Sequence, residues 1–201
     1  MLSADGTPWL MHDETLERTS SGAGRMCDTP DVELRKLDAG SYRHGAFAGE
    51  SLPTFEQAAQ LCRELGLLVN VEIKPAEGFE QATGEQVAHR VLDLWQGAAL
   101  PLVSSFSETA LQAARRVAPN LPLGFLCEQP PIDWLHRVEA VGAFSLHCAA
   151  GLVDDDVLHA AILRSIPVLC WTVNDRRSAE ALLERGVAAI FSDRPDLMSG
   201  L

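Results

Sequence analysis

The sequence predicts an α/β protein built as a (β/α)8 barrel that lacks its first one to two strands. From residue 51 onward, short β-branched apolar runs alternate with helical patterns, which is typical of βα units on a parallel sheet. The runs are continuously apolar, as strands covered on both faces require. The chain has 201 residues, roughly 50 fewer than the 250 or so of a complete barrel.

Six segments carry the strand pattern, and each is bounded by residues typical of turns or helix starts. They are residues 68–73, 102–105, 123–127, 143–146, 168–173 and 188–191. Catalytic groups of such a barrel lie at the C-terminal ends of its strands, where the βα loops emerge. The polar residues that follow these segments are therefore the first candidates for a functional site.

Helix start and stop signals lie between the strands. Thr54 is expected to cap a helix with Gln57 reaching back to it, and Gly66 is expected to end that helix. Further helix starts are expected at Ser107, at the acidic run 154–156 and at Ser178, the last of these helices ending at Gly186. The acidic run favours a helix N-terminus over a cation site, because anions stabilise that end of the helix dipole.

The first 50 residues differ from the rest, since they are rich in Gly, Ser, Thr and charge. Asp5-Gly6 predicts a two-residue hairpin turn whose outgoing strand is residues 8–11. The partner arm, residues 2–4, is shorter than an ordinary strand. Together with the length deficit, this short arm leads us to expect missing sequence ahead of residue 1.

Composition and charge exclude several functions. Sixteen basic and 28 acidic side chains give a formal charge of −12, so neither nucleic acid nor an anionic lipid surface is an expected partner. No apolar run has the length of a membrane-spanning helix, and residues 1–5 lack a signal-peptide pattern. We therefore expect no stable membrane association and a cytoplasmic location. The five cysteines have no C-x-x-C spacing and are expected to be reduced packing residues.

Two segments carry residues that could do chemistry. Glu72 and Lys74 lie at the end of an apolar strand and, being two residues apart, share a face. Because burying either charge alone is costly, they need partners such as a metal or a phosphate; a structural ion pair is an equal alternative.

His12-Asp13 follows the strand 8–11, and an imidazole can donate and accept a proton near neutral pH. An exposed or capped histidine is the commoner alternative. Acyl-transfer and zincin motifs are absent.

These residues belong to a longer resemblance. Residues 11–19, Met-His-Asp-Glu-Thr-Leu-Glu-Arg-Thr, resemble the His-Asp segment of glycerophosphodiester phosphodiesterases. Further segments are similar to motifs of the same family in the same order, at 34–40 with 52–55, 71–74, 103–106, 171–174 and 192–195. The motifs are individually short, but their order and spacing extend over nearly the whole chain.

The resemblance implies one phosphodiesterase barrel domain over residues 1–201, with a family-type insertion at about 15–50. It implies hydrolysis of a small glycerophosphodiester to an alcohol and glycerol 3-phosphate with a divalent cation, Ca²⁺ or Mg²⁺. His12 is then one of two acid/base histidines, Glu72 a metal ligand and Lys74 a catalytic phosphate contact. A hard cation prefers carboxylate oxygen and neutralises a phosphodiester, which agrees with these roles.

The same resemblance places Ser105, Phe106 and Trp171 on the substrate-binding rim. For Trp171, packing in the core of its strand is an equal alternative, because large aromatic side chains dominate cores. His147, after the strand 143–146, is a further residue that could face the site.

The chain also departs from the family pattern. The family's His-Arg-Gly and Glu-x-Asp motifs, which carry a second histidine, an arginine and two metal carboxylates, are absent. Glu72 is then the sole charged oxygen ligand, so we expect little or no activity from this chain. One alternative is a non-catalytic truncated barrel that binds a phosphate ester or a partner chain. Another is an aldolase-like barrel in which the Lys74 amine forms a Schiff base.

Overall fold

The computed structural model of the chain describes residues 1–200 and divides the chain into two compact units. Unit 1 comprises Met1–Val103 and Thr109–Leu121, and unit 2 comprises Ser104–Glu108 and Pro122–Leu201. Among the described residues, no helix is both long enough and apolar enough to cross a bilayer.

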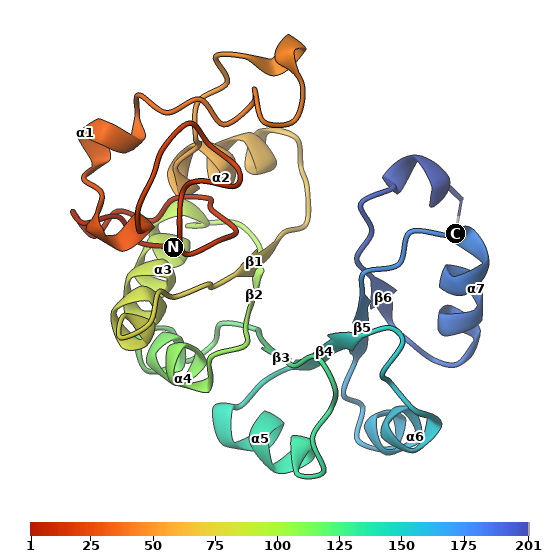
Figure 1. Cartoon of the computed structure of the whole chain (residues 1–201). Coiled ribbons are helices and arrows are strands. Elements are labelled where there is room, and N and C mark those ends of the chain that lie inside the picture. The colour runs from red at the N-terminus through yellow and green to blue at the C-terminus, as the bar shows by residue number, and fades with distance from the viewer. Residues whose placement is uncertain (201) are drawn as a thin grey trace. The chain divides into compact units, whose positions relative to one another are not determined.

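Helices and strands alternate along the chain from residue 55 onward (Figure 1). The first part contains η1 (Met26–Asp28), α1 (Asp31–Leu34), η2 (Gly45–Phe47), α2 (Phe55–Glu64), β1 (Asn70–Glu72), α3 (Glu80–Leu94), β2 (Leu102–Ser105) and α4 (Glu108–Val117). The second part contains β3 (Leu123–Leu126), α5 (Trp134–Val141), β4 (Ser145–Ala149), α6 (Asp155–Leu163), β5 (Val168–Trp171), α7 (Arg176–Glu184), β6 (Ala189–Ile190) and η3 (Pro195–Leu197). All six predicted strands are confirmed, although their ends differ from the predicted ends by up to about three residues.

The sheet of unit 2 is parallel, with β3, β4, β5 and β6 paired in chain order. Leu126 is in register with His147, and Cys148 is in register with Cys170. Figure 1 shows α5, α6 and α7 on one side of these strands. This order of successive parallel strands joined by helices is the βα repeat that the sequence predicted. The predicted incomplete eight-stranded barrel stays a prediction.

Helix caps agree with the sequence at two of the predicted starts. The Thr54 hydroxyl accepts from the Gln57 amide, and the Gln57 side chain accepts from the Thr54 amide, which completes the capping box of α2. The carboxylate of Asp154 caps α6. Ser178 is a wrong start for α7, because the Asp175 carboxylate accepts from the Ser178 amide at 2.8 Å and the helix begins at Arg176. Asp and Ser are both strong N-cap residues, and the earlier one is used here.

The N-terminal segment turns at the predicted place, but with Ala4 and Asp5 at the centre rather than Asp5 and Gly6, and it does not form the predicted strand. Gly6 has φ +78°, and its amide donates to the Ser3 carbonyl at 3.0 Å, as a tight turn requires. Residues 8–11 form only isolated bridges, Leu2 with Pro8 and Trp9 with Thr54. Pro8 has no N–H to donate to a strand ladder, which limits regular pairing at this position. The segment is instead held by buried side chains, Trp9, Met11, Leu16, Met26, Leu34 and Leu52.

Gly84 lets α3 approach α4 closely within unit 1. A Cβ atom at this position would lie 2.3 Å from the carbonyl oxygen of Ala110 on α4. We therefore expect Gly84→Ala to lower the free energy of unfolding by about 2 kcal/mol, as overpacking does. In an open helix the same substitution would raise the free energy of unfolding by roughly 1 kcal/mol, because alanine has the higher helix propensity. Urea unfolding measures the change, and Ala82→Gly on the exposed face of α3 is the control for helix propensity. A Gly84→Ala chain at least as stable as the parent would contradict the close contact.

Candidate active site

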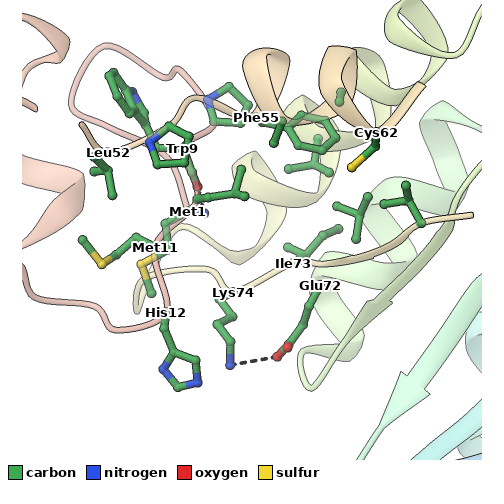
Figure 2. Close-up of a pocket in the computed structure, with 18 of the residues that line it drawn as sticks. Met1, Trp9, Met11, His12, Leu52, Phe55, Cys62, Glu72, Ile73 and Lys74 are labelled. Atoms are coloured by element: carbon green, nitrogen blue, oxygen red, sulfur yellow. Dashed lines mark hydrogen bonds and ion pairs between the residues drawn. The ribbon is translucent and has the colours of Figure 1, made fainter. Parts of the chain in front are cut away.

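Unit 1 contains a cavity of about 510 Å³ between β1, α2 and the segment that follows the N-terminal turn. Most of its wall is apolar, with Trp9, Met11, Leu52, Phe55, Ile73 and Trp95 among the lining residues. His12, Glu72 and Lys74 also line it. Figure 2 shows these three polar side chains extending in the same direction, away from Trp9 and Phe55. The cavity therefore has an apolar body and one polar end.

Strand β1 and the residues after it position the two charged groups. Glu72 and Lys74 are two residues apart and share a face, while Ile73 between them is 2% exposed and anchors the backbone in the core. The Lys74 Nζ lies 2.8 Å from Glu72 Oε1, and the two side chains are 25% and 32% exposed. The ion pair, one of the two alternatives that the sequence left open, thus forms, and both partners are accessible from the cavity.

His12 reaches the same cavity from a different part of the chain. It follows Met11, whose side chain is buried, and its own side chain is 68% exposed. The His12 Nδ1 lies 2.7 Å from Asp13 Oδ1, and Arg18 donates to both carboxylate oxygens of Asp13. The Arg18 hydrogen bond first, and the His12 hydrogen bond second, hold the pKa of Asp13 well below its usual range.

The described residues do not by themselves make a site for a divalent cation. Glu72 is the one carboxylate among the residues described as lining the cavity, and it is paired with Lys74. Within residues 1–200 no cluster of three His, Cys, Asp or Glu side chains could hold a metal. Because Ca²⁺ takes six to eight oxygen ligands and Mg²⁺ takes six, the donor set present here does not fit either ion.

The three predicted rim residues lie in unit 2. Ser105 is fully buried, and its hydroxyl accepts from the Ser107 amide at 3.0 Å. Phe106, which is 48% exposed, packs edge-on against Trp171 with 5.8 Å between the ring centroids. Trp171 is half-buried, so it is not a fully buried core residue. The structure therefore brings Phe106 and Trp171 together, and separately brings His12, Glu72 and Lys74 together.

His147 lies in the middle of β4 rather than at its end, and it is fully buried. The Nε2 atom is 2.9 Å from the Ser145 hydroxyl, and the ring is 5.5 Å from that of Phe191. Burial lowers the pKa of His147 to about 4. Gly124 on the neighbouring strand makes room for the ring, because a Cβ there would lie 2.6 Å from Nε2.

No role was predicted for Arg18, although it belongs to the segment that resembles the family. Asp13 and Arg18 are five residues apart, which matches neither helical nor strand spacing. The only available signal was an arginine close in sequence to an acidic residue beside a candidate catalytic histidine.

The fold and the site define an α/β protein in which an imidazole, a carboxylate and an ammonium line one cavity. The model of the glycerophosphoryl diester phosphodiesterase family matches residues 1–197. The chain belongs to this family, which confirms the resemblance read from its motifs.

Individual relatives agree with this membership. A phosphodiesterase of Oleispira antarctica, solved in complex with the product sn-glycerol-3-phosphate, is 33% identical with a TM-score of 0.95, over 99% of this chain and 81% of that one. The glycerophosphodiester phosphodiesterase of Caldanaerobacter subterraneus subsp. tengcongensis is 28% identical over 100% of this chain and 82% of its own length. That of Bacillus subtilis is 26% identical over 98% and 72%.

Proposed function

We propose that this chain is a glycerophosphodiester phosphodiesterase, a phosphoric diester hydrolase that releases an alcohol and glycerol 3-phosphate. The observation that carries the proposal is that His12, Glu72 and Lys74 line one cavity in a member of this family. The product bound to the Oleispira antarctica relative supports a small glycerophosphodiester as the substrate.

Lys74 is suited to bind the phosphoryl oxygens. Its ammonium carries three N–H donors and no acceptor, and one donor is directed at Glu72. The same ammonium carries the positive charge that an anion entering the cavity would meet. A charge-assisted hydrogen bond to a phosphate oxygen gains strength as negative charge develops on that oxygen in the transition state.

His12 is suited to protonate the leaving alkoxide. The ring is exposed at the cavity, and the side of the ring that faces Asp13 is held through Nδ1. The Nε2 atom is therefore the one that can exchange a proton with the substrate. An imidazole can both donate and accept a proton within one catalytic cycle.

The remaining roles are part of the same proposal. The family generally uses a divalent cation; with Ca²⁺ or Mg²⁺ bound, Glu72 would be the residue of this cavity that supplies a carboxylate oxygen, and the cation would supply positive charge to the phosphodiester. Of the predicted substrate-binding residues, Phe106 and Trp171 would offer an apolar surface to the carbon atoms of glycerol, whereas Ser105 is fully buried and would act through its hydrogen bond to the Ser107 amide.

A second candidate function is phosphate-ester binding without turnover. It is favoured by the donor set, because one carboxylate engaged by Lys74 cannot hold a hard cation well. The two candidates share the phosphate contact at Lys74 and differ in whether the ester bond is broken.

Binding and turnover measured together test both candidates. We expect calorimetry to show saturable binding of sn-glycerol 3-phosphate, and glycerophosphocholine to give little product, more with Ca²⁺ or Mg²⁺ than with chelator. Product that is lost in His12→Asn supports the hydrolase, and binding with no product at any cation concentration supports the second candidate. If neither ligand binds, both candidates are wrong.

A further inference from the structure

The exposed cluster of His12, Asp13 and Arg18 is built like a positioning device. Asp13 lies between the other two side chains, with Oδ1 2.7 Å from His12 Nδ1 and also 2.7 Å from Arg18 Nη2. The Arg18 Nε donates to the other oxygen, Oδ2. Both oxygens of the carboxylate are therefore fixed by one guanidinium, which is the bidentate geometry that arginine favours with carboxylates.

The shorter of the two contacts at His12 Nδ1 assigns the imidazole proton in this cluster. An ionised Asp13 carboxylate can only accept hydrogen bonds. In the short contact of 2.7 Å, Nδ1–H therefore donates to Oδ1. Arg18 Nη2 carries two N–H groups and also lies 3.2 Å from Nδ1, a longer contact than the 2.7 Å between Nδ1 and Asp13 Oδ1, so we assign the Nδ1 proton to the bond with Asp13. With the proton on Nδ1, the lone pair of neutral His12 is on Nε2.

We propose that Arg18 is a positioning residue that holds Asp13 so that His12 keeps its proton on Nδ1 and presents Nε2 to the substrate. This inference rests on the proposed function for the identity of the reaction, but its geometry does not. A carboxylate that orients a histidine and fixes its tautomer is an established device of acid/base catalysis. Arg18 acts through Asp13 and need not contact the phosphodiester.

The chain contains a matched control for this cluster. Arg25 makes the same kind of pair with Glu14, the residue after Asp13, and both side chains of that pair are 41% exposed. The Arg25–Glu14 pair therefore has comparable solvent exposure and the same charge, but within residues 1–200 neither side chain is hydrogen-bonded to His12. If removing any exposed ion pair disturbed this segment, variants of Arg25 and of Arg18 would show the same disturbance.

Nitrogen-15 NMR of histidine-labelled chain tests the proposal without requiring turnover, because the two ring nitrogens report the tautomer directly. The His12 signal is assigned by its absence in His12→Gln. Above the titration range of histidine, we expect His12 of the parent to be mainly the Nδ1–H tautomer. In Asp13→Ala we expect the ratio of Nδ1–H to Nε2–H to fall by about tenfold or more, as loss of a charge-assisted hydrogen bond implies.

The variants of Arg18 complete the experiment. Arg18→Met is expected to shift His12 toward Nε2–H, Arg18→Lys less so, and Asp13→Asn to retain part of the Nδ1–H form through its amide oxygen. Arg25→Met should leave the His12 signal unchanged. An Nε2–H parent, or a tautomer ratio unaffected by Arg18→Met, would overturn the proposal. An Nδ1–H parent that hydrolyses no glycerophosphodiester would leave the positioning intact and count against the proposed function.

Discussion

Lys74→Met is expected to weaken the binding of sn-glycerol 3-phosphate by about 10- to 100-fold. The ammonium supplies the charged donors at the polar end of the cavity, and a hydrogen bond to a charged group contributes about 1.5–3 kcal/mol. The variant also leaves Glu72 without the cation that lies 2.8 Å away in the parent. An unpaired carboxylate in the cavity repels the incoming phosphate, which adds to the loss.

The test is calorimetric titration of parent and variants with sn-glycerol 3-phosphate at low ionic strength. Lys36→Met is the matched control, because Lys36 is the other lysine of the sequence and pairs with Glu33 on the surface. The double variant Glu72→Gln with Lys74→Met removes the repulsion and should recover part of the affinity. Equal affinity in Lys74→Met and the parent would show that the phosphate does not bind at this end of the cavity.

The strands and the caps at Thr54 and Asp154 could be predicted because their signals are local. A continuous apolar run such as residues 168–173 reports a strand buried on both faces, and Thr54 with Gln57 reports a capping box. The prediction at Ser178 was wrong because two residues that can cap lie three positions apart. The predicted strand at residues 8–11 was wrong because regular pairing depends on partners that are distant in sequence.

The site could be predicted in part for a similar reason. Glu72 and Lys74 are neighbours on one strand face, so their pairing follows from spacing alone. Sequence spacing could not predict that His12 lies near them, since more than 50 residues intervene. The expectation that all three share one site came from the family resemblance. The bond of Arg18 to Asp13 and the burial of His147 depend on side-chain conformation and on neighbouring strands, which no local pattern reports.

His147 is expected to make the protein lose stability as the pH falls from about 6.5 to 4. Burial lowers the pKa of the folded state to about 4, whereas an unfolded histidine has a pKa of about 6.5. Between pH 6.5 and 4 the unfolded chain therefore binds a proton that the folded chain does not bind. The free energy of unfolding decreases as the pH is lowered through this window and does not change above it. A difference of about 2.5 pKa units at 1.36 kcal/mol per unit corresponds to about 3 kcal/mol.

The His147→Gln variant isolates this contribution because glutamine does not titrate and its amide can still pair with the Ser145 hydroxyl. At pH 7.5 the variant is expected to be less stable than the parent by about 1–2 kcal/mol, because glutamine does not fill the buried space of the imidazole ring in the same way. Toward pH 4 the difference should shrink by about 3 kcal/mol and change sign, as measured by urea unfolding across the range. His159→Gln, at an exposed position on α6, should track the parent at every pH. Parallel stability curves for the parent and His147→Gln would mean that the His147 imidazole does not resist protonation in the folded protein.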